Sequence, residues 1–99
     1  MVVFPGDCKA FYLRLREGME LARQKHPVFA EGKYHALGVI GEEYRELEKA
    51  ITKEGDIRSV EEAWDVLLTC ARFILGEHRV MEGGEPGFGW EKKAFLNKG

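Results

Sequence analysis

The chain has 99 residues, a length that suits one domain. Its composition, 44% hydrophobic and 32% charged, is typical of a folded globular protein and argues against a disordered one. The net charge is −2 and the basic residues do not cluster, which argues against nucleic acid as a partner, because a nucleic-acid binder needs a basic surface. No apolar run approaches the roughly 20 residues of a membrane span, so no membrane contact is expected.

The two cysteines, Cys8 and Cys70, do not form a C-x-x-C pair, so no zinc site is predicted. Both fall on apolar helix faces, and we expect them to be buried free thiols. The first residues, Met-Val-Val-Phe-Pro, are too short a stretch for a secretory signal. Free thiols and the lack of a signal favour a reducing, cytoplasmic location.

A first helix is predicted to follow the turn at residues 5–6, with Asp7 as its N-cap. Pro27 is expected to end it, because proline has no backbone N–H to donate to the helix. Its apolar residues recur at helical spacing. They are Cys8, Phe11, Tyr12, Leu15, Met19 and Ala22.

A second helix is predicted over about residues 33–54, and Gly55 supplies the left-handed residue that ends it. Gly38 and Gly41 lie inside this helix, where each costs roughly 1 kcal/mol relative to alanine. That cost predicts that another backbone passes close to them. The apolar stripe of the helix is expected to comprise Leu37, Ile40, Tyr44, Leu47 and Ile51.

A third helix is predicted to begin near Ser59 and to run past Leu75, with apolar residues over most of its circumference. The glycine-rich stretch 81–89 is expected to be a loop, and residues 90–97 a short last helix. Short links between helices favour antiparallel neighbours. No segment alternates with a period of two, so the whole chain, 1–99, is predicted to be a single all-α antiparallel bundle.

Two pairs of acidic residues stand out, Glu43 with Glu46 and Glu62 with Asp65. Residues three apart share a helix face, so each pair can converge on one ion. Fifteen residues separate Glu46 from Glu62, enough to end one helix, turn and begin the next, so a hairpin can set the pairs opposite one another. The alternative is a solvated acidic surface, but Glu43 falls in an apolar sector of its helix.

Several carboxylates that face inward repel one another, by about 4 kcal/mol for a pair ~4 Å apart at an effective dielectric of ~20. A hard divalent cation relieves this repulsion, and ligands that are all oxygen favour Mg²⁺, with Mn²⁺ as a substitute. No histidine follows a glutamate by three residues, which argues against a carboxylate-bridged iron site. Ser59 and Glu62 also match a capping box, which would give Glu62 a purely structural role unless Asp56 caps the helix instead.

These residues carry a family resemblance. The segments Gly-Glu-Glu-Tyr-Arg-Glu-Leu-Glu-Lys-Ala (41–50) and Glu-Glu-Ala-Trp-Asp-Val-Leu-Leu (61–68) resemble the two metal-binding helices of the MazG-like all-α nucleotide pyrophosphohydrolases. The resemblance covers roughly residues 33–75. It implies a helical bundle assembled as a homodimer or homotetramer. It also implies hydrolysis of a (d)NTP to the monophosphate and pyrophosphate, in nucleotide-pool house-cleaning. The magnesium ligands it implies are Glu43, Glu46, Glu62 and Asp65.

In such a reaction one carboxylate accepts a proton from the attacking water, and Glu43 or Glu46 is predicted to be this catalytic base. By resemblance the attack is near the α-phosphate. Arg72 follows Asp65 on the same polar stripe and is a candidate phosphate-binding residue, as are Lys92 and Lys93. Trp90 could stack on the nucleotide base or, alternatively, fold the end of the chain onto the bundle.

Two other readings stay open at this point. The first is a catalytically weak or inactive bundle that binds metal and nucleotide without turnover, which missing phosphate-binding residues would favour. The second is a purely structural dimerisation module, for which Glu43 and Asp65 would face solvent. The base and sugar preference depends on the shape of a pocket, which the sequence does not display.

Overall fold

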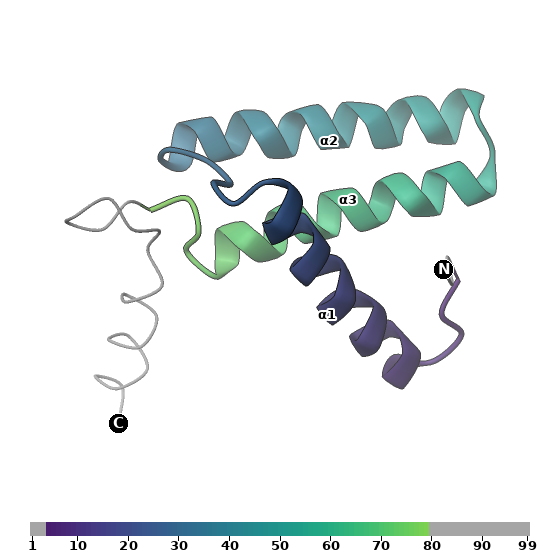
Figure 1. Ribbon diagram of the computed structural model, residues 1–99. Helices are drawn as coiled ribbons and strands as arrows, with labels where there is room; N and C mark the ends of the chain where they lie inside the picture. Colours follow the sequence, from purple (N-terminus) through teal and green to yellow (C-terminus); the bar gives the residue numbers. More distant parts are fainter. Residues whose placement is uncertain (1–3, 80–99) are drawn as a thin grey trace.

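A computed structural model describes residues 4–79, which form three packed α-helices and no strand (Figure 1). Helix α1 spans Cys8–Lys25, α2 spans Lys33–Lys53 and α3 spans Asp56–Ile74. The predicted all-α class is therefore confirmed over this part of the chain. The loop predicted at 81–89 and the helix predicted at 90–97 lie outside the described residues. Within residues 4–79 no helix is long and apolar enough to cross a lipid bilayer.

Helix α1 begins and ends where the sequence predicts. The Asp7 side chain caps it by accepting a hydrogen bond from the backbone N–H of Ala10 at 2.8 Å. The helix ends at Lys25, two residues before Pro27.

The cysteines are free thiols, but the predicted burial is wrong for Cys8, which is exposed, while Cys70 is partly buried. Cys8 is the first residue of the helix.

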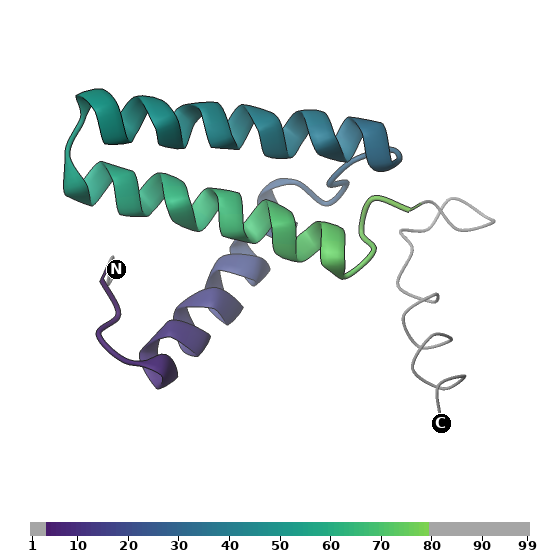
Figure 2. The same ribbon diagram turned by 180° about the vertical axis from the view of Figure 1, so that it is seen from behind.

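Helices α2 and α3 form an antiparallel hairpin, and α1 crosses them obliquely (Figures 1 and 2). Gly55 makes the connection with φ of 95°, a conformation that glycine adopts without strain. This turn is so tight that α3 begins at Asp56, three residues before the predicted start. The helix ends at Ile74, earlier than predicted, and Gly76 follows with φ of 82°.

The capping box predicted for Ser59 and Glu62 is absent, because both residues lie inside the first turns of α3 rather than at its start. The Ser59 hydroxyl donates instead to the carbonyl oxygen of Gly55 at 2.7 Å. Glu62 is thereby free to take part in contacts other than capping.

Helix α2 buries small side chains on the side that carries Glu43. Ala36, which packs with Phe29 and Ala30 of the preceding connection, and Ala50 are fully buried, and they lie seven residues either side of Glu43. Positions seven apart fall on nearly the same helix face, so the carboxylate of Glu43 belongs to the face that approaches α3.

The predicted apolar stripe of α2 lies mostly at the surface. Leu37, Tyr44 and Ile51 are 65%, 56% and 63% exposed. The buried side of α2 is the other apolar sector, which holds Ala36 and Ala50 around Glu43.

The expectation for the α2 glycines is also not met within residues 4–79. A Cβ atom added at Gly38 would have no neighbour within 4 Å, and one at Gly41 would meet only the Arg45 guanidinium at 3.6 Å. The close approach occurs instead at Gly18 in α1. A Cβ atom there would lie 3.2 Å from both methyl groups of Leu68, so Gly18 lets α1 pack tightly on α3.

Candidate metal centre

Three carboxylates meet across the α2–α3 hairpin. Glu43 on α2 and Glu62 and Asp65 on α3 each place one oxygen so that all three atoms lie within 4.8 Å of one another. The alanine face of α2 brings Glu43 to α3, and the spacing of Glu62 and Asp65 places them one turn apart on the same side. Glu62 is 8% exposed and Glu43 is half-buried, whereas Asp65 has the most open surface of the three.

Glu46, the fourth predicted ligand, is exposed and lies outside this cluster. It is one turn beyond Glu43, at the edge of the face that packs on α3, so its side chain points more toward solvent. Its charge still acts on the site, since it contributes to raising the pKa of Glu43. The structure thus brings together three of the four predicted carboxylates.

The clustered acids carry unfavourable negative charge. Burial is the largest cause that raises the pKa of Glu43 above its usual value, followed by repulsion from Asp65 and Glu62. Burial of its carboxyl group is also the largest cause that raises the pKa of Asp65, and repulsion by Glu62 is the next. The residue as a whole is exposed, but its carboxyl group faces the pocket and Glu62. Arg58 and Arg14 lower that pKa in part. An all-oxygen set of mutually repelling carboxylates fits a hard divalent cation such as Mg²⁺.

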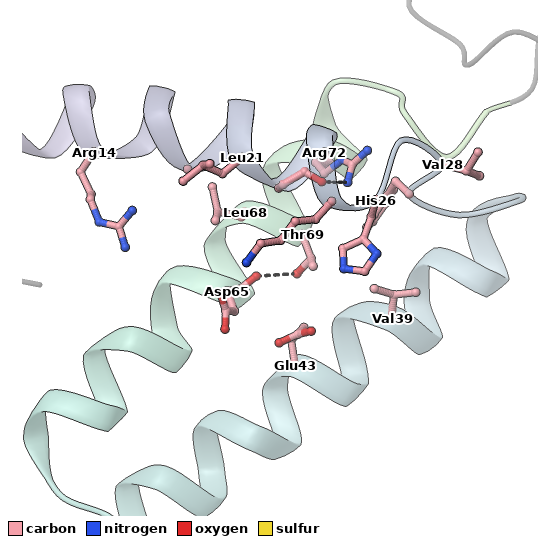
Figure 3. A pocket seen from close by; sticks show the side chains of 14 residues that line it. Arg14, Leu21, His26, Val28, Val39, Glu43, Asp65, Leu68, Thr69 and Arg72 are labelled. Atoms are coloured by element: carbon pink, nitrogen blue, oxygen red, sulfur yellow. Dashed lines mark hydrogen bonds between the residues drawn. The ribbon is translucent and has the colours of Figure 1, made fainter. Parts of the chain in front are cut away.

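A pocket of about 520 Å³ opens beside these carboxylates and is lined by all three helices (Figure 3). Glu43 and Asp65 face each other across it from α2 and α3. The wall formed by α1 and the residue after it is basic, and contributes Arg14, Lys25 and His26. Apolar side chains complete the lining. They include Leu21, Val28, Phe29, Val39 and Leu68.

Arg14 is a pocket residue that was not predicted from the sequence. Its guanidinium lies over the Trp64 ring, 5.1 Å from the ring centroid. Its Nε is buried and has no hydrogen-bond partner among residues 4–79. A signal for it exists in the sequence, since Arg14, Gly18 and Lys25 fall on one face of α1 at helical spacing. Only the packing of α1 on α3 reveals that this face meets the carboxylates.

Arg72 lines the same pocket but is engaged elsewhere. It is 3% exposed, and its Nε donates to the Glu77 carboxylate at 2.7 Å, while its Nη1 lies 3.4 Å from the Ala22 carbonyl oxygen. The other oxygen of Glu77 accepts from Arg23 Nε at 3.0 Å. These bonds tie the end of α3 to α1, so a structural role for Arg72 is visible. Its phosphate contact stays a prediction.

The other predicted substrate-binding residues, Trp90, Lys92 and Lys93, lie outside the described residues.

The pocket lining combines carboxylates that suit a metal ion, basic side chains that suit an anion, and apolar side chains. This combination fits a ligand that carries several negative charges together with an apolar ring, bound with a divalent cation. Comparison of the chain with protein-family models, curated proteins and solved structures finds no match.

Proposed function

We propose that this protein is a magnesium-dependent nucleoside triphosphate pyrophosphohydrolase of MazG-like type, which converts a (d)NTP and water to a (d)NMP and pyrophosphate. The observation that carries the proposal is the cluster of Glu43, Glu62 and Asp65, two of which, Glu43 and Asp65, line a pocket of about 520 Å³. The resemblance of residues 41–50 and 61–68 to the metal helices of that family supports it. The proposed role is the removal of unwanted nucleotides in the cytoplasm.

Glu43, Glu62 and Asp65 would hold Mg²⁺, or Mn²⁺ in its place, with Glu46 one turn away as a further ligand. The cation, when bound, supplies charge neutralisation on the phosphates and a lowered pKa for water. Glu43 is the proposed base, since its half-buried carboxylate faces the pocket from α2. Glu46 is the other candidate, and its exposure makes it the weaker one.

The basic wall accounts for the choice of a polyphosphate substrate. Arg14, Lys25 and His26 line the pocket together with Glu43 and Asp65, and can donate hydrogen bonds to phosphate oxygens there. The volume of about 520 Å³ lies within the ~300–1,000 Å³ typical of small-molecule sites. Lys92, Lys93 and Trp90 remain proposed additions to this pocket, for phosphate and base respectively.

We also propose that the protein assembles as a homodimer or homotetramer. The support is the exposed stripe of Leu37, Tyr44 and Ile51, whose seven-residue spacing is that of a helix seam. Covering these side chains with a second copy would remove apolar surface from water.

A second candidate function is binding of nucleotide and Mg²⁺ without turnover. The observation that favours it is the engagement of Arg72 with Glu77 and Ala22, since this arginine follows the second acidic motif and was the best-placed candidate for a phosphate contact.

The test is pyrophosphate release from the eight common NTPs and dNTPs with Mg²⁺. We compare the natural protein with Glu43→Gln and with Glu42→Gln, a matched change at an exposed neighbour. The proposal expects release that falls by about 10²–10⁴-fold in Glu43→Gln and is retained in Glu42→Gln. Release of orthophosphate in place of pyrophosphate would contradict it. Binding of Mg²⁺ and nucleotide without any release would favour the second candidate.

A further inference from the structure

We propose that Arg58 is a positioning residue for the metal ligand Glu62: it holds one carboxylate oxygen so that the other is directed at the ion. The inference rests on the proposed function, because it takes Glu43, Glu62 and Asp65 as the metal site. Arg58 belongs neither to that cluster nor to the pocket lining. Its proposed role concerns the affinity for the metal and not contact with the substrate.

The contact between the two side chains is direct. Arg58 Nη2 donates to Glu62 Oε1 from one turn earlier on α3. The Glu62 side chain is 10% exposed, so water has little access to it and its protein partners determine its orientation. A carboxylate has two oxygens. Because Oε1 is held by a charged hydrogen bond, we assign the second oxygen, on the side of Glu43 and Asp65, to the ion.

A metal ligand of this kind needs to be held before the ion arrives. Glu43, Glu62 and Asp65 repel one another when ionised, and the repulsion favours any rotation that separates them. The Arg58 contact opposes that rotation for Glu62. Hydrogen bonds from outside a metal site commonly orient its ligands in this way, and their loss typically weakens metal binding by about 10–100-fold.

The positive charge of Arg58 would by itself repel a cation, but it is largely offset. Arg58 Nη1 lies 2.9 Å from Glu61 Oε1, and its Nε lies 3.7 Å from Glu54 Oε1. Two carboxylates other than Glu62 therefore share the guanidinium charge. The charge of Arg58 still reaches Asp65, whose pKa it lowers. In the proposed role, the hydrogen bond to Glu62 outweighs the remaining repulsion of the ion.

The arrangement also separates Arg58 from the substrate. Arg58 is half-exposed on the outer side of the cluster, near the hairpin turn, whereas the basic residues of the pocket come from α1. Arg58 is thus distinct in role from Arg14. A change at Arg58 is expected to act on the metal, and a change at Arg14 on the phosphates.

The test is titration of the whole chain with Mn²⁺ alone, followed by electron paramagnetic resonance of the free ion. Arg58→Met is expected to weaken Mn²⁺ binding by about 10–100-fold. Arg58→Lys keeps the charge but not the forked donors, so its affinity should fall between those of Arg58→Met and the natural protein. The control is Arg16→Met, which should leave Mn²⁺ binding unchanged. Arg16 is exposed on α1, and its Nε lies 4.0 Å from Glu20 Oε1, a long distance for an ion pair.

Circular dichroism establishes that each variant is folded, and Arg58→Lys serves as the test by itself if Arg58→Met does not fold. Binding by either Arg58 variant that is equal to or tighter than that of the natural protein overturns the inference, and tighter binding would make Arg58 a competitor of the ion. Absence of Mn²⁺ binding by the natural protein would instead overturn the proposed metal site itself.

Discussion

Glu43 is half-buried on the face of α2 that packs against α3, with a fully buried alanine seven residues to either side. This environment is readable from the sequence, because the spacing of Ala36, Glu43 and Ala50 puts an acid in an apolar sector. The position of Glu46 was harder to predict. An i, i+3 pair spans about 60° of the helix, and the packing angle of α3 decides that only Glu43 meets the cluster.

The raised pKa values of Glu43 and Asp65 predict how the metal-free protein responds to pH. A carboxyl group whose pKa is higher in the folded than in the unfolded chain stabilises the fold below its unfolded pKa. That contribution is lost as the pH rises through the folded pKa. Both shifts are upward, with burial as the largest cause and the neighbouring acids next. Ionisation of these groups therefore opposes folding at neutral pH.

We accordingly expect Glu43→Gln to melt at a higher temperature than the natural protein at pH 7 in the presence of EDTA. The difference should shrink as the pH falls toward about 4, where an ordinary glutamate begins to take up its proton. Thermal melts across this range measure it, with exposed Glu42→Gln as the control. A Glu43→Gln protein that is less stable than the natural one at pH 7 would contradict the account.

Arg14 lies at the basic wall of the pocket with a buried Nε that has no partner in residues 4–79. We expect Arg14→Met to raise the KM for a nucleoside triphosphate by about tenfold or more, since a charged hydrogen bond is typically worth ~1.5–3 kcal/mol. Steady-state kinetics at saturating Mg²⁺ measures this. Arg16→Met, two residues along on another face of α1, should leave KM unchanged. If the KM of Arg14→Met is unaltered, Arg14 of α1 does not contact the substrate.

At the scale of the elements, the hairpin of α2 and α3 determines the site. The hairpin is expected because Gly55 supplies a turn and apolar residues recur at helical spacing before and after it. The sequence shows two apolar sectors on α2, one around Glu43 and one along Leu37, Tyr44 and Ile51. Leu37, Tyr44 and Ile51 form the more hydrophobic stripe, but the small side chains of Ala36 and Ala50 permit the closer packing. Hydrophobic periodicity does not distinguish two apolar faces of one helix.

The hairpin packing can be tested at Ala50, which has no exposed surface. Ala50→Leu adds three carbons where α2 meets α3, and overpacking of this kind typically costs about 1–3 kcal/mol. We expect the urea midpoint to fall accordingly. Lys49→Leu, an equally large apolar side chain at the exposed neighbouring position, should change stability by no more than about 0.5 kcal/mol. Equal stability of the two variants would mean that this face of α2 is not packed.

At the scale of the whole molecule, the three helices within residues 4–79 carry many exposed apolar side chains. The sequence predicts such an excess from the apolar circumference of α3. The structure shows that α2 also contributes to it, through Leu37, Tyr44 and Ile51. Which faces remain open depends on how α1 crosses the hairpin, a long-range arrangement that local patterns do not encode.

If a second copy covers the α2 stripe, Tyr44→Glu should shift the protein toward monomers, because a charge would be buried without a partner. Sedimentation over a range of concentrations measures the shift. Lys49→Glu introduces the same acid at an exposed position on another side of α2 and should leave the assembly intact. A natural protein that is monomeric at all concentrations would contradict the proposed assembly.

The central claim is that Glu43, Glu62 and Asp65 hold a divalent cation. The most direct measurement is anomalous diffraction from crystals of the whole chain grown with Mn²⁺ and a nonhydrolysable nucleoside triphosphate analogue. The account predicts a manganese peak between these three carboxylates, with Arg58 still bonded to Glu62 and the phosphates extending toward Arg14. The absence of a manganese peak at these three carboxylates, whether or not manganese is found elsewhere on the protein, would contradict it.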